Sequence, residues 1–206
     1  YGCLVGSEMC IRDRLNIKYL MVGDDFKFGK ERSGDFDFLS DWGSNNQIEV
    51  DRIPTHSFEG RRVSSTWIRE SIADGNFDLA AKLLDRRYTF SGKVVFGNKV
   101  GRTIGVPTAN IWVPKSNLPI KGVYAVKALV KGETFNGIAN MGVRPTVGGT
   151  SPVLEIHIFD FNEEIYGCRI EVEFYQKIRN EKKFENLDKL KEQINLDIAE
   201  TRKYFS

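Results

Sequence analysis

The feature that most constrains this fold is a run of strand-like segments that follows Arg87. Five segments are rich in β-branched and aromatic residues and are separated by Gly, Pro and Asn turn signals: 88–96, 122–130, 135–141, 153–161 and 170–178. Strands that alternate in places and recur at this spacing indicate an antiparallel sheet that curls on itself. We predict a closed or nearly closed antiparallel barrel.

The end of the chain predicts a helix instead of a strand. Asn186 can cap its first turn, and apolar residues then recur at helical spacing, at Leu187, Leu190, Ile194 and Ile198. We expect this stripe to pack the helix against the barrel.

The part of the chain before the barrel shows an α/β pattern. The apolar run 17–22 predicts a buried strand, a helix is expected to begin at Ser64 or Ser65, and a second helix is expected over 77–84. One strand and two helices make a poor core, so we expect this part to be incomplete.

The change of period near Asp85 sets the predicted domain boundary. Residues 1–14 show no sustained period and resemble translated adaptor sequence, so we interpret them as a non-native leader. The chain then divides into an α/β segment at 15–85 and a barrel domain at 86–206.

Composition excludes several classes of protein. The chain has 206 residues and a formal charge of +2, which lacks the strong basic bias typical of nucleic-acid binders. No apolar run approaches the roughly 18 residues of a membrane span. Three cysteines cannot form a fully paired disulfide framework, and their spacings match no zinc site, so a reducing cytoplasm is the simplest location.

A glycine-rich stretch is the first candidate for a ligand site. Its glycines lie close to the positive charges of Lys93 and Arg102, at Gly92, Gly97, Gly101 and Gly105. Glycines let backbone N–H groups approach a phosphate closely, although the spacing is not that of a Walker motif. Glycines between the strands of a small barrel are also ordinary turn residues, and from these residues alone both interpretations stay open.

Pro107, Thr108 and Asn110 follow directly. If a strand begins at Thr108, the side chains of Thr108 and Asn110 point the same way and present two neutral oxygen ligands to one point. Mg²⁺ prefers such hard oxygen donors and usually keeps several waters. The alternative is that both side chains only satisfy hydrogen bonds of a turn.

The segment 153–161 offers a candidate general base. Leu154, Ile156 and Ile158 share one face of the predicted strand, which leaves Glu155 and His157 on the other. Glu155 could take a proton from a substrate hydroxyl, or it could simply lie on a solvated outer face.

Three motifs in order, GRTIGVPTAN, LEIHIFDF followed by YG, and IRNEKKF, resemble the riboflavin kinase family. The resemblance runs from about Leu84 to the C-terminus. It implies a six-stranded antiparallel Greek-key barrel with a C-terminal helix, which transfers the γ-phosphate of ATP to the ribityl 5′-hydroxyl of riboflavin to give FMN. Upstream, VGDDFKFG and RRVSSTWIRE resemble the FMN adenylyltransferase half of the bacterial bifunctional enzymes, the FAD synthetases.

The resemblance also implies roles for individual residues. Thr108 and Asn110 match the residues that hold Mg²⁺ and the nucleotide phosphates, and Glu155 matches the catalytic base. Gly97 and Arg102 fall in the nucleotide-binding loop, so they are expected to bind ATP together with the metal pair.

Two further residues fall in the matched motifs. Arg179 falls near the loop on the flavin side, where the alternative is a run of solvated surface charges. His157 matches the family pattern as well, but a histidine beside a glutamate is more often structural.

The upstream resemblance is only partial. Part of a phosphate-binding motif is matched by Ser64, Ser65, Thr66 and Arg69, which could equally form a plain helix cap. An adenylyltransferase of this family opens with a His-x-Gly-His motif, and neither His56 nor His157 lies in one. We therefore expect riboflavin/FMN and ATP/ADP as partners and no FAD synthesis by this chain. A non-catalytic flavin- or nucleotide-binding module is the alternative, and the oligomeric state is left open.

Overall fold

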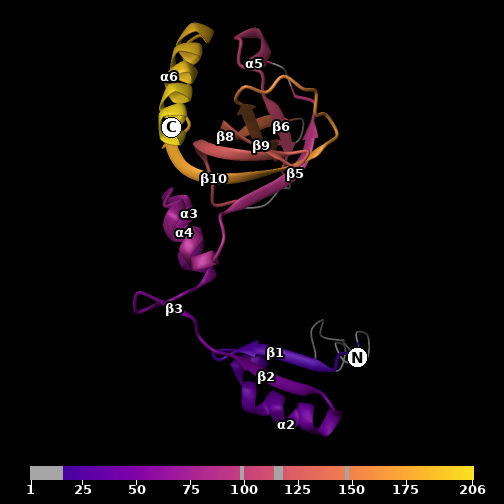
Figure 1. The fold of residues 1–206 in the computed structure, drawn as a ribbon. Coiled ribbons are helices and arrows are strands. Elements are labelled where there is room, and N and C mark those ends of the chain that lie inside the picture. Colours follow the sequence, from indigo (N-terminus) through magenta and orange to yellow (C-terminus); the bar gives the residue numbers. More distant parts are fainter. Residues whose placement is uncertain (1–15, 98–99, 114–117, 147–148) are drawn as a thin grey trace. The chain divides into compact units, whose positions relative to one another are not determined.

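The computed structural model describes residues 16–97, 100–113, 118–146 and 149–206 (Figure 1). The predicted leader at 1–14 lies outside these ranges. Contacts divide the chain into two compact units, Tyr1–Val63 and Ser64–Ser206. The division lies upstream of Asp85, so the two helices expected before that residue share a unit with the barrel. The domain boundary near Asp85 stays a prediction.

The first unit contains a β–α–β arrangement. Strand β1 (Tyr19–Gly23) pairs in parallel with β2 (Glu49–Ile53), and helix α2 (Phe36–Asn46) connects them. The carboxylate of Asp35 accepts a hydrogen bond from the backbone N–H of Phe38 at 3.1 Å and so caps α2.

The described part of this unit also contains three short elements: the 3₁₀ helix η1 (Lys30–Arg32) and a hairpin formed by β3 (Ser57–Phe58) and β4 (Arg61–Arg62). The strand expected over 17–22 is present as β1, but it is not the buried strand that was predicted, because Tyr19 and Met21 are exposed and only Val22 is buried. Helix α2 and strand β2 were not predicted.

Two helices begin the second unit, as predicted. They are α3 (Ser65–Ala73) and α4 (Phe77–Leu84). Phe77 is buried against barrel residues, stacked on Phe174 at a centroid distance of 5.8 Å and edge-on to Tyr124 at 5.6 Å. The helix pair is therefore part of the barrel's hydrophobic core, which it extends at one end (Figure 1).

Six strands close into an antiparallel barrel, which confirms the predicted fold class. The order around the barrel is β10-β5-β6-β9-β8-β7. The strands are β5 (Thr89–Val95), β6 (Ala109–Trp112), β7 (Gly122–Val130), β8 (Glu133–Thr146), β9 (Gly149–Ile158) and β10 (Arg169–Arg179). The chain passes from β6 to β7 across the positions of β9 and β8, which is a Greek-key connection.

Side-chain alternation fills the barrel with apolar groups. Leu154 and Ile156 are fully buried in the core cluster, whereas Glu155 and His157, between and after them, are only half-buried. The predicted division of this strand into two faces is confirmed. The polar side chains of β9 therefore lie on the outer face of the barrel.

Helix α6 (Leu187–Phe205) covers part of that outer face (Figure 1). Asn186 caps it, since its side chain accepts from the backbone N–H of Lys189 at 2.9 Å. Ile198 packs against a small outer cluster of Val123, Ile138 and Phe159. The predicted helix and its packing on the barrel are confirmed, except that Leu187, the first residue of the predicted stripe, is exposed.

Candidate active site on the outer face of the barrel

One hoop of paired residues around the barrel carries three residues of the predicted site, Asn110, Glu155 and Arg179. Asn110 on β6 pairs with Glu155 on β9, and Glu155 pairs in turn with Asn140 on β8. Asn140 pairs with Val123 on β7, which pairs with Arg179 on β10. Because their strand neighbours fill the core, these side chains lie side by side on the outer face, in spite of their separation in the sequence.

A cavity of about 370 Å³ lies over this hoop. Its floor includes Asn140, Glu155 and His157 from the barrel. The 100–108 segment, which includes helix α5 (Val100–Thr103), contributes Thr108, and α6 contributes Leu190 and Ile194. The cavity thus combines polar groups on its floor with apolar groups on its walls, as small-molecule sites commonly do.

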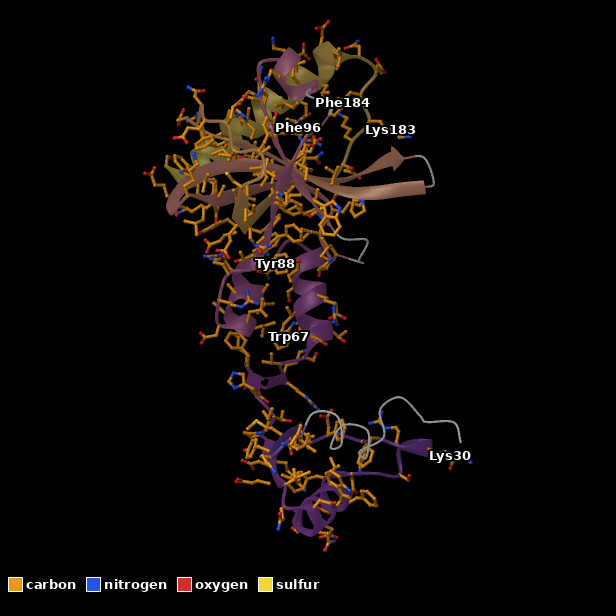
Figure 2. The ribbon with its side chains drawn as sticks, turned by 90° about the vertical axis from the view of Figure 1, so that its right-hand side faces the viewer. Lys30, Trp67, Tyr88, Phe96, Lys183 and Phe184 are labelled. Carbon is orange, nitrogen blue, oxygen red and sulfur yellow. The ribbon has the colours of Figure 1, made fainter. Side chains whose placement is uncertain are left out.

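The segment between β10 and α6 supplies another wall. Glu181, Lys182 and Phe184 line the same cavity, and Phe184 lies at the end of this unit that is opposite to Trp67 of α3 (Figure 2). The IRNEKKF motif therefore borders the site that holds Glu155.

A second and smaller cavity, of about 80 Å³, shares Thr108 with the first. Arg102 and Tyr166 are among its lining residues. Tyr166 stacks on the exposed ring of Phe96, with a centroid distance of 4.1 Å and an interplanar angle of 22°. Thr108 therefore faces both cavities, while Arg102 faces only the smaller one.

Close backbone approach explains two of the glycines. A Cβ atom on Gly97 would lie 2.4–2.5 Å from the side-chain amide of Asn110, whose side chain is buried. A Cβ atom on Gly101 would lie 2.3 Å from the carbonyl oxygen of Val106 and 3.3 Å from Oγ1 of Thr108. Both predicted metal ligands therefore sit against a glycine backbone that a larger residue would displace.

His157 connects the floor of the cavity to the glycine-rich segment. Its Nδ1 atom lies 2.8 Å from the carbonyl oxygen of Pro107, and its ring contacts Phe159 edge-on at a centroid distance of 5.6 Å. This geometry agrees with the structural role expected for His157.

Arg179 forms a buried ion pair with α6. Its Nε lies 2.8 and 3.0 Å from the carboxylate oxygens of Asp197, and its Nη2 lies 2.8 Å from one of them. Gln193 also donates to Asp197, at 2.9 Å, and Nη1 of Arg179 donates to the carbonyl of Asn180 at 3.0 Å. Arg179 lines the cavity, but these contacts direct its guanidinium to the helix, so a contact with flavin stays a prediction.

Comparison with known proteins identifies the family. A family model described as riboflavin kinase matches residues 84–205, which is more than half of the chain. The chain belongs to the riboflavin kinase family. A model described as FAD synthetase matches residues 7–67, a range that begins inside the predicted leader and ends at the start of α3.

Bacterial bifunctional enzymes are among its relatives. The bifunctional riboflavin kinase/FMN adenylyltransferase of Haemophilus influenzae is 47% identical over 97% of this chain and 65% of that protein. The enzyme of the same description from Escherichia coli (strain K12) is 45% identical over 97% of this chain and 64% of that protein. The chain thus spans somewhat less than two thirds of the length of these relatives.

A solved structure shares the fold. A crystal structure described as a macrolide-efflux protein from Streptococcus pneumoniae matches with a TM-score of 0.72 and 35% identity, over 91% of this chain and 61% of that chain. Across the described part of this chain, we find no helix that is long and apolar enough to cross a membrane.

The residues that resemble the adenylyltransferase motif lie at the start of α3. The hydroxyl of Ser64 accepts from the backbone N–H of Trp67 at 3.2 Å, so Ser64 is the N-cap of the helix. Ser65, Thr66 and Arg69 are exposed on its first turns. The helix-cap alternative is observed, and phosphate binding by these four residues stays a prediction.

Sequence reasoning missed two residues of the site, Asn140 and Asp197. Asn140 lies in a predicted strand, but its place beside Glu155 depends on the pairing of β8 with β9. Asp197 is 3% exposed and lies three residues after Ile194 on the predicted apolar stripe. A carboxylate on the buried stripe of a helix requires a partner, and that signal could have found the ion pair.

Proposed function

We propose that this chain is a riboflavin kinase, which transfers the γ-phosphoryl group of ATP to the ribityl 5′-hydroxyl of riboflavin. The observation that carries the proposal is the position of Glu155. It lies between Asn110 and Asn140 on the floor of a cavity that also contains Thr108. A carboxylate can accept the proton of an alcohol, and hydroxyl and amide oxygens beside it can hold a phosphate-bound cation, so this arrangement suits phosphoryl transfer to an alcohol.

Each residue then has a defined part. Glu155 accepts the proton of the riboflavin hydroxyl while the oxygen of that hydroxyl forms a bond to the γ-phosphorus. The bond from that phosphorus to the β,γ-bridging oxygen breaks, and ADP leaves. The transition state of such a transfer is stabilised mainly by alignment and by charge. The apolar side chains of Leu190 and Ile194 would contribute to alignment, because they would hold the flavin in place and exclude water.

The residues fit a Mg²⁺ ion shared with the nucleotide. Thr108 and Asn110 would provide a hydroxyl and an amide oxygen, and their side chains lie against Gly101 and Gly97. Thr108 lines both cavities, and Asn110 is buried beside Glu155 on the neighbouring strand. In the described residues, no three His, Cys, Asp or Glu side chains gather into a metal site. Two neutral oxygen donors suit an ion that keeps waters and binds phosphate oxygens. When bound, Mg²⁺ would neutralise negative charge on the phosphates.

The smaller cavity is the proposed position of part of the nucleotide. It adjoins Thr108, it is lined by the cation Arg102, and its aromatic neighbours Phe96 and Tyr166 are stacked. Gly97 follows Phe96 in the sequence and allows the backbone to approach Asn110. ATP on this side and riboflavin on the Glu155 side would meet at Thr108. We place the reaction in the cytoplasm, where ATP is available and thiols are reduced.

The test is to incubate the 206-residue chain with riboflavin, ATP and Mg²⁺ and to separate the flavins by chromatography. We expect the parent chain to form FMN. Glu155→Gln should lower kcat by about 10²–10⁴-fold, as loss of a general base does, while the variant still binds riboflavin and ATP. Glu171→Gln is the matched control, because Glu171 is an exposed carboxylate on β10.

Two results would contradict the proposal. A folded chain that binds flavin but forms no FMN would be the non-catalytic binding module. Full activity in Glu155→Gln would remove the assigned base. A parallel incubation with FMN and ATP should give no FAD, because the two histidines of the chain, His56 and His157, form no His-x-Gly-His motif.

A further inference from the structure

We infer that His157 is a positioning residue of this site, which fixes the backbone that presents Thr108. This inference rests on the proposed function. The starting observation is the 2.8 Å contact between Nδ1 of His157 and the carbonyl oxygen of Pro107, which joins β9 to a segment fifty residues earlier in the chain. His157 follows Glu155 by two residues, so both side chains lie on the outer face of β9 and border the same cavity.

The chemistry of the contact fixes the state of the ring. A carbonyl oxygen can only accept a hydrogen bond, so Nδ1 of His157 must carry the proton. In the neutral ring this selects the Nδ1–H tautomer and leaves Nε2 as an acceptor. The edge-on contact with Phe159 holds the plane of the ring. His157 therefore acts toward Pro107 as a fixed donor.

The position of the contact explains why a side chain is needed there. The ladder between β6 and β9 pairs Ala109 with Ile156 and does not continue to Thr108 and His157, which would be the next pair in that register. Strand β6 begins at Ala109, so Pro107 and Thr108 lie beyond its hydrogen bonds to β9. The imidazole of His157 replaces the missing backbone pair with a bond to Pro107.

The direction of the Thr108 side chain depends on the hydrogen bond between His157 and Pro107. Thr108 lies between Pro107, which His157 holds, and Ala109, which the ladder holds, and it faces both cavities. Its side chain also lies against Gly101. A rotation of the backbone at Thr108 would turn Oγ1 away from the nucleotide side. Loss of the bond should therefore weaken the site for ATP and Mg²⁺ while Glu155 keeps its place.

The test compares three variants of His157 that differ in where they place a donor. In Asn the amide nitrogen is as many bonds from Cα as Nδ1 is, so His157→Asn can keep the bond, whereas His157→Gln places its nitrogen one bond further and His157→Leu has no donor. We expect His157→Leu to raise KM for ATP by about tenfold, the upper range for one net hydrogen bond, with a smaller change in kcat. His157→Asn should recover most of the affinity, and His157→Gln should not.

Two measurements do not require turnover. Calorimetry with ADP and Mg²⁺ should show the same order of affinities, parent and His157→Asn above His157→Gln and His157→Leu. Nitrogen-15 NMR should show the neutral ring protonated at Nδ1. Its signal is assigned with His56→Gln, since the chain has only two histidines. If the parent makes no FMN, the proposed function fails, and these two measurements still test the role of His157.

The outcomes that overturn the inference are specific. Equal ADP affinity in the parent and His157→Leu would show that Thr108 does not depend on the bond. Equal losses of ADP affinity in all three variants, accompanied by equal falls in melting temperature, would show that His157 acts only in packing. A ring protonated only at Nε2 would exclude the bond to Pro107.

Discussion

Two Asp–Arg pairs that differ in burial join helix α6 to the barrel. Replacing the carboxylate should therefore lower the melting temperature by a different amount in each pair. The side chains of Arg179 and Asp197 are 20% and 3% exposed, whereas those of Arg202 and Asp160 are 50% and 77% exposed. Both pairs are close, at 2.8 Å and 2.9 Å for their Nη2–carboxylate contacts. If distance alone decided the stability, both replacements would lower the melting temperature equally. The difference in burial predicts that they do not.

The size of the difference follows from what each change leaves behind. Asp197→Asn keeps the shape of the side chain but leaves the Arg179 guanidinium in a partly buried place without its counter-charge. Removing one partner of a buried pair costs about 3 kcal/mol, which for a chain of this length lowers Tm by roughly 6–12 °C. In Asp160→Asn the freed guanidinium of Arg202 is solvated, so we expect little change in Tm.

The assay is thermal unfolding followed by circular dichroism at neutral pH, with both single variants and a double variant, Arg179→Met with Asp197→Leu. The double variant should recover much of the loss, because apolar residues of similar volume often replace a buried ion pair at little cost. Equal melting temperatures for Asp197→Asn and Asp160→Asn would refute the reasoning. So would a double variant that is less stable than Asp197→Asn.

Two further predictions concern the nucleotide side and the alkaline limit of stability. Gly97→Ala should raise KM for ATP more than tenfold in steady-state kinetics, because its Cβ would lie 2.4–2.5 Å from the amide of Asn110. An unchanged KM would mean that Asn110 can move aside. Burial, and then the hydrogen bond to Glu173, raise the pKa of Tyr175 to about 12. The fold thus favours the neutral phenol, so stability should fall as pH rises from about 10 to 12, and urea unfolding should show a smaller fall in Tyr175→Phe.

The elements that were predicted well are those with a local signal at the start and a distinct apolar period. Strand β7 (Gly122–Val130) and helix α4 (Phe77–Leu84) have the predicted bounds, because glycine or asparagine marks their starts and their apolar periods are distinct. Helix α2 was missed because FDFLSDWGSNN contains glycine, serine and asparagine, which favour turns over helix interiors. Strand β2 was missed because most of its residues are exposed, which weakens its alternation.

The candidate site could be predicted only in part, because its residues meet through the closure of the barrel. The motifs supplied Thr108, Asn110 and Glu155, but the pairing that puts Asn140 beside Glu155 is a property of the register between β8 and β9. The neighbours of Arg179 likewise depend on where α6 packs, which places Asp197 against it. Local sequence determines which face a side chain takes, and only the three-dimensional fold determines which side chains share that face.

The size of the barrel explains why the site lies outside it. A closed barrel of six strands is too narrow to enclose a ligand, and here its interior is filled by buried side chains such as Ile111, Leu154 and Phe174. A ligand can therefore bind only where other elements cover the outer face and leave a cavity, as α5, α6 and the segment after β10 do. The half-burial of polar residues that alternate with core residues, such as Glu155 and His157, is the structural sign of such a covered face. In a strand that faced plain solvent, the same alternation would leave these side chains exposed.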